Sequence, residues 1–295
     1  MTHKFMPALP ETGKEADVHW KKIDRRNSAC AEKLLREHEL WCVAACGRFL
    51  KRRSSKDTAW ILLGRNNDIH ALIVYSNRTL LPVFCGSMDI PEPKFLKKFF
   101  GMLPIHSIQG LVNEVIFIEQ YLSKNGLEAI DKIDYDLMYI DNMSNNAAVN
   151  SGPAGLTLRE AQRPDLDELA ALQAGYEQEE VLPQGAVFYP TVSRLNMEKI
   201  FANEQLLVAE LGGHLVGKIN TSAETFTRNQ IGGVYVLPAY RNMGIARRMT
   251  AEFVRMLLGQ GRGVSLFVKK SNPAAKAVYQ RLGFKFLADY RISYF

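Results

Sequence analysis

The stretch GGVYVLPAYRNMGIARRMTAEFVRML, from Gly232 to Leu257, decides how the second half of this chain folds. Its first part is an apolar run typical of a strand, and its last part repeats apolar residues at the spacing of an amphipathic helix. Between them, RNMGIA places an arginine, a glycine and an alanine in a short link. Such a link is either an ordinary structural turn or a phosphate cradle, because a helix N-terminus offers unpaired backbone N–H groups and a positive dipole end.

Three residues of the link have properties that a phosphate site needs. Gly244 has no side chain, so the backbone there can approach a phosphate closely. Ala246 keeps the third position small, and Arg241 adds a charge-assisted donor. The link contains neither the Lys-Ser/Thr pair of a P-loop nor the Gly-x-Gly-x-x-Gly of a dinucleotide fold, so both of those nucleotide sites are excluded.

Size and composition limit the classes of protein that this chain can belong to. Its 295 residues are enough for two domains of ordinary size, and the hydrophobic share of 47% is that of a soluble globular protein. The net charge of +6 suits an anionic ligand and does not indicate nucleic-acid binding. No apolar run reaches the roughly 20 residues of a membrane helix, and the first residues resemble no signal peptide. We therefore expect a cytoplasmic protein without a membrane partner.

The four cysteines, Cys30, Cys42, Cys46 and Cys85, all lie in the first third of the chain. So few cysteines indicate a reducing compartment. Cys42 and Cys46 would share one face of a helix, with His38 nearby, which raises the question of a metal site. The pattern lacks the paired, closely spaced ligands of a zinc site, so we expect free thiols and no metal.

The second half, residues 156–295, has a clear order of predicted elements: strand, two helices, three strands, helix, strand, helix and a final strand region. Gly212 and Gly213 predict a hairpin between two of the strands. The strand-helix-strand unit around 234–268 predicts a parallel pair with a crossover helix. The fold class is therefore α/β with a mixed sheet.

The first half is predicted as a separate α/β domain covering residues 1–145. Residues 23–50 have the apolar spacing of one helix, and strands and two shorter helices follow. The region 142–155, rich in Asn, Ser, Gly and Pro, is typical of an interdomain linker. The first half either repeats the fold of the second in degenerate form, as a tandem arrangement, or is a dissimilar accessory domain.

Two motifs in the second half resemble those of the GNAT N-acetyltransferase superfamily. VLPAYRNMGIA, from Val236 to Ala246, is similar to the acetyl-CoA-binding motif V-x-P-x-x-[RQ]-x-x-G-[IV]-[GA]. NPAAKAVYQRLGF, from Asn272 to Phe284, resembles N-x-x-A-x-x-x-Y-x-x-x-G-F. The order of predicted elements over 156–295 also matches that fold, whereas the first half has neither motif.

The resemblance implies where acetyl-CoA binds. The backbone of one strand segment would pair with the pantetheine arm, the link before the helix would wrap the pyrophosphate, and one residue after the next strand would also contact the cofactor. In that order these residues are Val234, Tyr235 and Val236, then Arg241, Asn242, Met243, Gly244, Ile245 and Ala246, and finally Asn272.

The resemblance also implies candidate catalytic residues. Tyr279 stands where the family often has a general acid that protonates the departing CoA thiolate, although its ring could also simply pack against the sheet. Asn272 could serve as a helix cap, as a cofactor ligand, or as both. For the base, YEQEE offers Glu180, besides Glu177 and Glu179, and a later strand offers Glu224; an acidic cluster at a helix end is also consistent with a solvated face.

The expected function is therefore transfer of an acetyl group from acetyl-CoA to a primary amine: a small molecule, a lysine or a protein N-terminus. The alternative is a non-catalytic acyl-CoA-binding sensor or regulatory module. The two-domain layout also raises a peptidoglycan- or tRNA-linked acyltransferase of tandem build. The sequence leaves the amine and the oligomeric state open.

Overall fold

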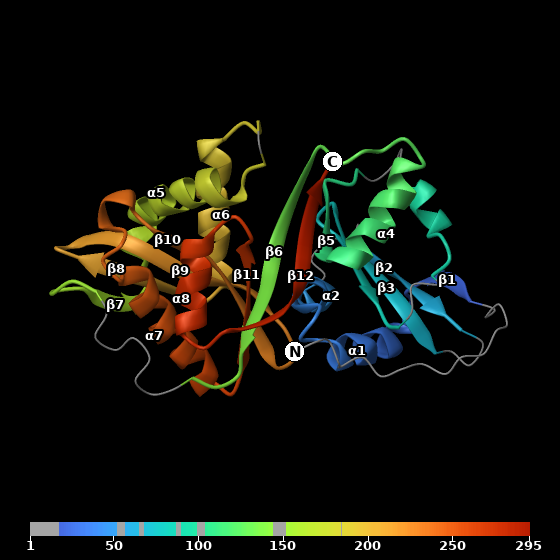
Figure 1. Cartoon of the computed structure of the whole chain (residues 1–295), viewed down its shortest axis with the longest axis horizontal. Helices are drawn as coiled ribbons and strands as arrows, with labels where there is room; N and C mark the ends of the chain where they lie inside the picture. Colours follow the sequence, from blue (N-terminus) through green and yellow to red (C-terminus); the bar gives the residue numbers. More distant parts are fainter. Residues whose placement is uncertain are drawn as a thin grey trace.

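A computed structural model describes residues 18–51, 57–64, 68–86, 90–98, 104–143, 152–183 and 185–295. One mixed sheet of twelve strands runs through this part of the molecule, with helices on both faces (Figure 1). The predicted α/β class with a mixed sheet is confirmed.

The elements of the first half begin with strand β1, and those of the second half begin with β7. The first half contains β1 His19–Lys22, α1 Ser28–Glu37, α2 Val43–Leu50, β2 Thr58–Leu63, β3 Ile69–Ser76, β4 Thr79–Phe84, a 3₁₀ turn Lys94–Lys98, β5 Ser107–Leu111, α4 Val112–Ser123 and β6 Asp131–Ile140. The second half contains β7 Thr157–Glu160, α5 Leu166–Tyr176, a π-helical turn Glu177–Val181, α6 Pro190–Asn203, β8 Leu206–Leu211, β9 His214–Glu224, β10 Arg228–Val236, α7 Ile245–Gly259, β11 Gly263–Lys269, α8 Pro273–Arg281 and β12 Lys285–Tyr294.

The sheet has the order of a duplicated unit. Its strands run β1-β2-β3-β4-β5-β12-β6-β11-β10-β9-β8-β7. When each strand is replaced by its counterpart in the other half (β1 by β7, β2 by β8 and so on), the result is the same order read from the opposite edge of the sheet. The pairs β4–β5 and β10–β11 are parallel and also correspond to each other. This order is that of a tandem repeat, one of the two arrangements predicted for the first half.

The two halves exchange strands at the centre of the sheet (Figure 1). Strand β6 of the first half lies between β11 and β12 of the second. Strand β12 lies between β5 and β6 of the first half. Each of these two strands thus has both of its neighbours in the other half, so the hydrogen bonding of the sheet joins the halves.

Each half packs helices on both faces of its part of the sheet. In the second half, α7 and α8 cover one face through residues such as Phe253 and Leu282, and α5 and α6 cover the other through Leu172 and Met197. In the first half, α1 and α2 cover one face, and α4 covers the opposite one. Because side chains alternate along a strand, each strand contributes to both cores.

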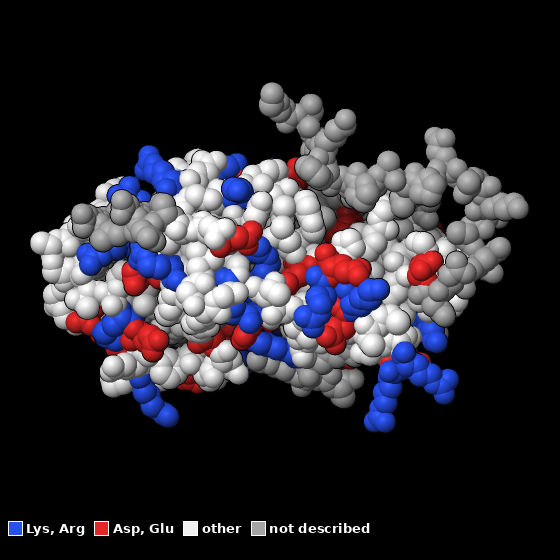
Figure 2. All heavy atoms as spheres, turned by 90° about the horizontal axis from the view of Figure 1, so that it is seen from below, with Lys and Arg blue, Asp and Glu red and all other residues white. Residues whose placement is uncertain are grey.

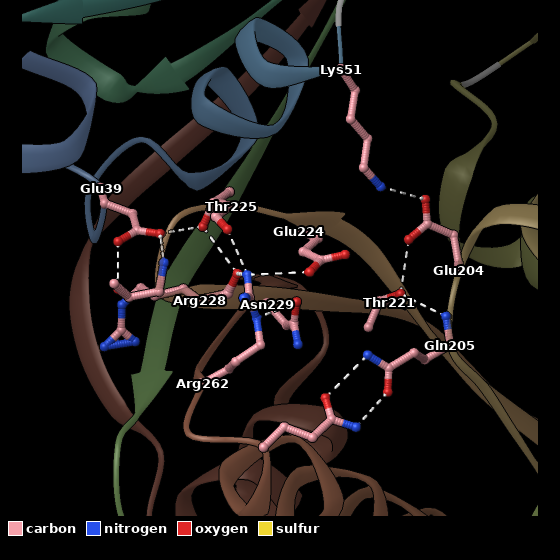
Figure 3. Close-up of polar contacts among 12 residues, drawn as sticks. Glu39, Lys51, Glu204, Gln205, Thr221, Glu224, Thr225, Arg228, Asn229 and Arg262 are labelled. Carbon is pink, nitrogen blue, oxygen red and sulfur yellow. Dashed lines mark hydrogen bonds and ion pairs between the residues drawn. The ribbon is translucent and has the colours of Figure 1, made fainter. Parts of the chain in front are cut away.

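The helix predicted over residues 23–50 is two helices, so that prediction is wrong in detail. The turn between α1 and α2 places Glu39 against the β9–β10 connection of the second half (Figure 3). Its carboxylate accepts hydrogen bonds from Thr227 N at 2.7 Å, from Thr227 Oγ1 at 2.6 Å and from Thr225 Oγ1. An unbroken helix would not bring this buried carboxylate to these donors. The apolar spacing continues across the turn between α1 and α2, so the sequence pattern did not reveal that turn.

The other predicted elements of the second half are confirmed. Gly212 and Gly213 form the β8–β9 turn, both with positive φ, as a tight hairpin needs. The final region is one strand, β12. Strand β1 was not predicted, because HWKK has no apolar alternation. Residues 144–151 of the predicted linker lie outside the described residues. The first of the two shorter helices predicted for the first half spans residues 93–103; its described part is the 3₁₀ turn Lys94–Lys98, and residues 99–103 lie outside the described residues.

Within the described ranges, the structure has no helix long and apolar enough to cross a bilayer. On the face shown in Figure 2, lysine and arginine side chains alternate with aspartate and glutamate side chains. The positive net charge is therefore not gathered into one broad basic surface on that face.

Candidate functional site

Strands β10 and β11 diverge at the centre of the candidate site. Their parallel pairing runs from Arg228 opposite Gly263 to Ile231 opposite Leu266. Beyond that point, β10 continues to Val236 and β11 to Lys269, and no backbone pairing joins these described segments. Two parallel strands that separate in this way leave backbone groups open to an extended ligand between them.

A β-bulge at Gly233 shapes the edge of this opening. The register between β9 and β10 shifts between Gly232 and Tyr235, and Gly233 has φ of +60°. A Cβ at Gly233 would clash with the Asn220 side chain and would lie 2.7 Å from Lys218 Nζ. Both the backbone conformation and the crowding require glycine here.

Lys218 is a fully buried lysine behind the bulge, with none of its surface exposed. Its Nζ donates to the Gly233 carbonyl at 3.0 Å and to Asn220 Oδ1 at 3.1 Å, and it lies 5.0 Å from the centre of the Tyr176 ring. Burial lowers the pKa of Lys218 to about 7, and the nearby charge of Glu177 opposes this shift. The sequence analysis missed this residue, because one lysine in the strand HLVGKINTSA carries no motif.

A cavity of about 420 Å³ occupies the opening between the diverging strands, and we call it the inner cavity. Val234 lines it, as do Glu180, Asn272 and Tyr279. These four predicted site residues are thus brought together from β10, the π-helical turn and α8. Tyr235, Val236 and the segment 241–246 do not line this cavity.

Tyr279 lies on α8 and is 7% exposed. Its ring packs edge-on against Phe284, with ring centres 5.7 Å apart. Burial raises the pKa of Tyr279 well above its ordinary value, and the nearby Tyr176 and Glu180 raise it further. The phenol therefore both packs against its neighbours and lines the cavity as a protonated hydroxyl.

Asn272 and Glu180 are hydrogen-bonded to each other across the site. Asn272 Oδ1 accepts from Ala275 N at 3.0 Å, so the residue caps α8. Asn272 Nδ2 donates to Glu180 Oε1 at 3.1 Å, and Glu180 Oε2 lies 3.6 Å from Lys269 Nζ. Glu180 stands on a π-helical turn, a distortion that is frequent at functional sites.

Arg241 is held beside the site rather than within the inner cavity. Its guanidinium donates to both oxygens of Glu179, at 2.8 and 2.9 Å, and to the Val236 carbonyl at 3.0 Å. The Tyr235 hydroxyl also donates to Glu179, at 2.9 Å. Glu179 thus fixes two of the predicted cofactor-binding residues.

The N-terminus of α7 has the properties of an anion site. Gly244 is the N-cap with φ of +81°, no side chain caps the first turn, and no acidic residue lies in it. Arg247 and Arg248 lie in that turn and add positive charge near the positive end of the helix dipole. Ile245 is buried in the core, so only its backbone can contact a ligand; Asn242 and Met243 are exposed. The sequence analysis did not single out the two arginines.

The first half has a corresponding opening, and the carboxyl group of a glutamate fills it. Strand β4 pairs with β5 only at Thr79–Ser107 and Leu80–Ile108 within the described residues. Past these pairs, Glu114 of α4 accepts from Phe84 N at 2.8 Å and from Leu111 N at 3.2 Å. Among the described residues between β4 and β5 there is a 3₁₀ turn and no α-helix. The described residues between these two strands therefore provide no helix N-terminus at the place that corresponds to α7.

A second cavity, of about 680 Å³, adjoins the inner cavity, and we call it the outer cavity. Both halves line it: α2 and the β3–β4 turn from the first half, and α6, β9 and β10 from the second. Gln109, Glu204, Ser222 and Gln230 line both cavities.

Comparison with known proteins gives matches in the second half of the chain. Residues 169–284 match the model of the acetyltransferase (GNAT) family. A mycothiol acetyltransferase of Amycolatopsis mediterranei (strain U-32) is 33% identical over 110 residues. That match covers 34% of this chain and 36% of the relative, so it spans only about a third of either protein.

Solved structures resemble nearly the whole chain at low sequence identity, which bears on the fold alone. A Drosophila protein superposes with a TM-score of 0.62 at 12% identity, over 94% of this chain and 98% of that one. A GCN5-related N-acetyltransferase from Sphaerobacter thermophilus gives 0.55 at 19% identity, over 94% of each chain. A tandem GNAT protein from the clavulanic acid biosynthesis pathway gives 0.55 at 11% identity, over 94% and 98%.

Proposed function

Because the C-terminal half of this chain, through residues 169–284, belongs to the acetyltransferase (GNAT) family, we propose that the protein transfers the acetyl group of acetyl-CoA to a primary amine. The observation that carries this proposal is the inner cavity between the diverging strands β10 and β11, with the phenol of Tyr279 in its wall. No acyl-enzyme intermediate is needed, because the amine attacks the thioester directly.

Acetyl-CoA binding would involve three regions of the second half. The uncapped first turn of α7, from Gly244 to Ala246, would hold the pyrophosphate, with Arg241, Asn242 and Met243 beside it. The backbone of Val234, Tyr235 and Val236 would pair with the pantetheine arm, and Asn272 would contact the cofactor from the start of α8. The open N–H groups and the small residues at the turn fit an anionic cosubstrate.

The reaction needs three contributions from the residues around the inner cavity: stabilisation of the oxyanion, a proton for the thiolate, and removal of a proton from the amine. As the C–N bond forms, the carbonyl oxygen gains negative charge, which the N–H of Val234 beside the bulge would stabilise. As the C–S bond breaks, the Tyr279 hydroxyl would give its proton to the leaving thiolate. The proton lost by the amine would pass to Glu180, directly or through water. The C–N bond replaces the C–S bond, and passage of the proton from Glu180 to the Tyr279 phenolate, directly or through water, would restore the enzyme.

The cofactor site is tested with Gly244→Glu. A carboxylate at the α7 N-cap would meet the diphosphate with steric and like-charge conflict, so calorimetry should show loss of CoA binding. Gly259→Glu at the other end of α7, where a Cβ meets nothing within 4 Å, is the matched control and should retain binding. Unchanged CoA affinity in Gly244→Glu would refute the assignment.

Turnover distinguishes an enzyme from a CoA-binding sensor. Release of free CoA thiol should be measured with acetyl-CoA and a broad panel of amines. The proposal expects amine-dependent thiol release together with an acetylated product by mass spectrometry. Tight CoA binding without acetylation of any amine in the panel would favour the regulatory module instead.

A further inference from the structure

We propose that the outer cavity is the acceptor site and that the acceptor is an amine carrying an anionic group, a carboxylate or a phosphate. This inference rests on the proposed acetyl transfer and names the substrate class of that same site. The outer cavity adjoins the inner one through four shared lining residues, so an amine placed there can face the thioester.

The charges of the outer cavity favour an anion. Its lining includes two arginines and two lysines, Arg48, Lys51, Arg78 and Lys199, against two carboxylates, Asp57 and Glu204. None of the four cations lines the inner cavity. Lys51 is paired with Glu204, with Nζ and Oε1 3.6 Å apart (Figure 3). The positive excess therefore lies away from the reacting atoms.

Arg78 and Lys199 are the cations available to bind the anionic group. Neither has an ion pair among the described residues. Arg78 sits on a firmly held turn: its φ is +62°, and its carbonyl accepts from His106 N at 2.8 Å and from Ser107 N at 3.3 Å. The backbone of Arg78 at the cavity wall is thus fixed before a ligand binds, so only its side chain has to be ordered on binding.

The junction of the two cavities suits the amine end of such a molecule. Gln230 Oε1 is buried and has no hydrogen-bond partner in the described structure, yet the residue lines both cavities. A buried acceptor without a donor is costly, and an amine N–H would satisfy it. Glu204 lines both cavities as well and offers further acceptor oxygens at the junction, although its charge is paired with Lys51. Acceptor oxygens therefore lie at the junction, where the amine would bind, and cations lie in the outer cavity, where the anionic group would bind.

The test compares matched amines on the wild-type protein and three variants. The amines are amino acids, their C-terminal amides, and phosphoethanolamine; the variants are Arg78→Ala, Lys199→Ala and their double. Lys285→Ala, an exposed lysine that lines neither cavity, is the control. Initial rates give kcat and KM, and calorimetry in the presence of CoA gives acceptor binding without turnover.

We expect the wild-type protein to prefer an anionic amine over its neutral amide. In the double variant, KM for the anionic amine should rise about tenfold or more with kcat nearly unchanged, while values for neutral amides stay constant. Preference between amino acids and phosphoethanolamine identifies which anion is used. Equal kcat/KM for anionic and neutral amines, or a double variant that behaves as Lys285→Ala, would overturn the inference while leaving acetyl transfer intact. If the wild-type protein neither acetylates nor binds any of these amines, both proposals are overturned.

Discussion

At the scale of single residues, the buried amino group of Lys218 gives the bulge an electrostatic role. Lys218 Nζ bonds to the Gly233 carbonyl, and that carbonyl shares its peptide group with the N–H of Val234. Hydrogen bonds in series polarise one another, so an amine donor on the carbonyl, most strongly in its charged form, makes the N–H of the same peptide a stronger donor. In the proposed reaction, Lys218 would therefore act through the backbone, as a positioning residue that does not touch the substrate.

Lys218→Met should slow acetyl transfer more than it weakens cofactor binding. With the Lys218 donor removed, Val234 N–H becomes a weaker partner for the developing oxyanion. We expect kcat to fall about tenfold, which is less than the fall of about 10²-fold or more that follows removal of an oxyanion donor itself. Calorimetry should give nearly the same affinity for CoA. The carbonyl stretch of bound ¹³C-labelled acetyl-CoA should also move toward its position in water. If only thermal stability changes, with kcat and the stretch unaltered, Lys218 has a structural role alone.

Tyr279→Phe tests the proposed acid. The ring and its packing against Phe284 remain, and only the hydroxyl is lost, so the fold and the CoA affinity should be kept. A positioned acid typically contributes about 10²-fold or more, and kcat should fall by that order. Steady-state thiol release and calorimetry measure the two quantities. A fully active variant would remove Tyr279 from the mechanism.

At the scale of elements, the sequence predicted most of what local pattern controls. The order of helices and strands in the second half, the Gly212–Gly213 hairpin and the parallel β10–β11 pair follow from periodicity and turn chemistry, and all are confirmed. The break between α1 and α2 was missed, because it serves Glu39 and its distant partners Thr225 and Thr227. An apolar pattern records a buried face and not such a long-range contact.

Helix α4 shows why the two openings of the sheet differ. In the first half, the Glu114 carboxyl group accepts hydrogen bonds from the backbone N–H groups of Phe84 and Leu111, in the opening between β4 and β5. A Cβ at Gly110 would lie 3.2 Å from Glu114 Oε2, so glycine makes room for this carboxyl group. In the second half, the corresponding space between the strands is the inner cavity.

Glu114 should also make stability depend on pH. Burial raises the pKa of Glu114 to about 8, although bonds from Phe84 N and Leu111 N oppose the shift. Because the folded pKa is raised, the contribution is fully present below the unfolded pKa of about 4.5 and is lost as pH rises toward 8. Glu114→Gln cannot titrate, so its free energy of unfolding should decline less than that of the wild type between pH 5 and 8. Urea titrations at several pH values measure this, and parallel curves would contradict it.

At the scale of the whole molecule, the exchange of β6 and β12 is the feature that no local pattern predicted. Strand β6 and residues 285–294 were both expected as strands, but their neighbours lie more than a hundred residues away along the chain. The same is true of the outer cavity, whose walls come from both halves. The cofactor motif could be predicted, since it lies within one strand, turn and helix. The acceptor side could not, since it is assembled from distant segments.

Residues 18–143 and 152–295 should not fold when produced separately. Each fragment keeps one strand, β6 or β12, whose two partners are missing, so buried side chains such as Met138 and Tyr290 would be exposed. We expect each fragment alone to aggregate, and the two co-expressed to associate as a complex. Size exclusion and circular dichroism measure the outcome. Two stable monomeric fragments would show that the strand exchange is dispensable.

The exchange of β6 and β12 also affects folding during protein synthesis, because β6 is synthesised before its partner strands. Translation adds about 5–20 residues per second, so β6 emerges from the ribosome roughly 6 to 30 seconds before β11 and β12 exist to pair with it. During that interval the nascent first half carries an unmatched strand. We therefore expect the newborn chain to depend on chaperones, and slow codons before residue 263 should lower its yield.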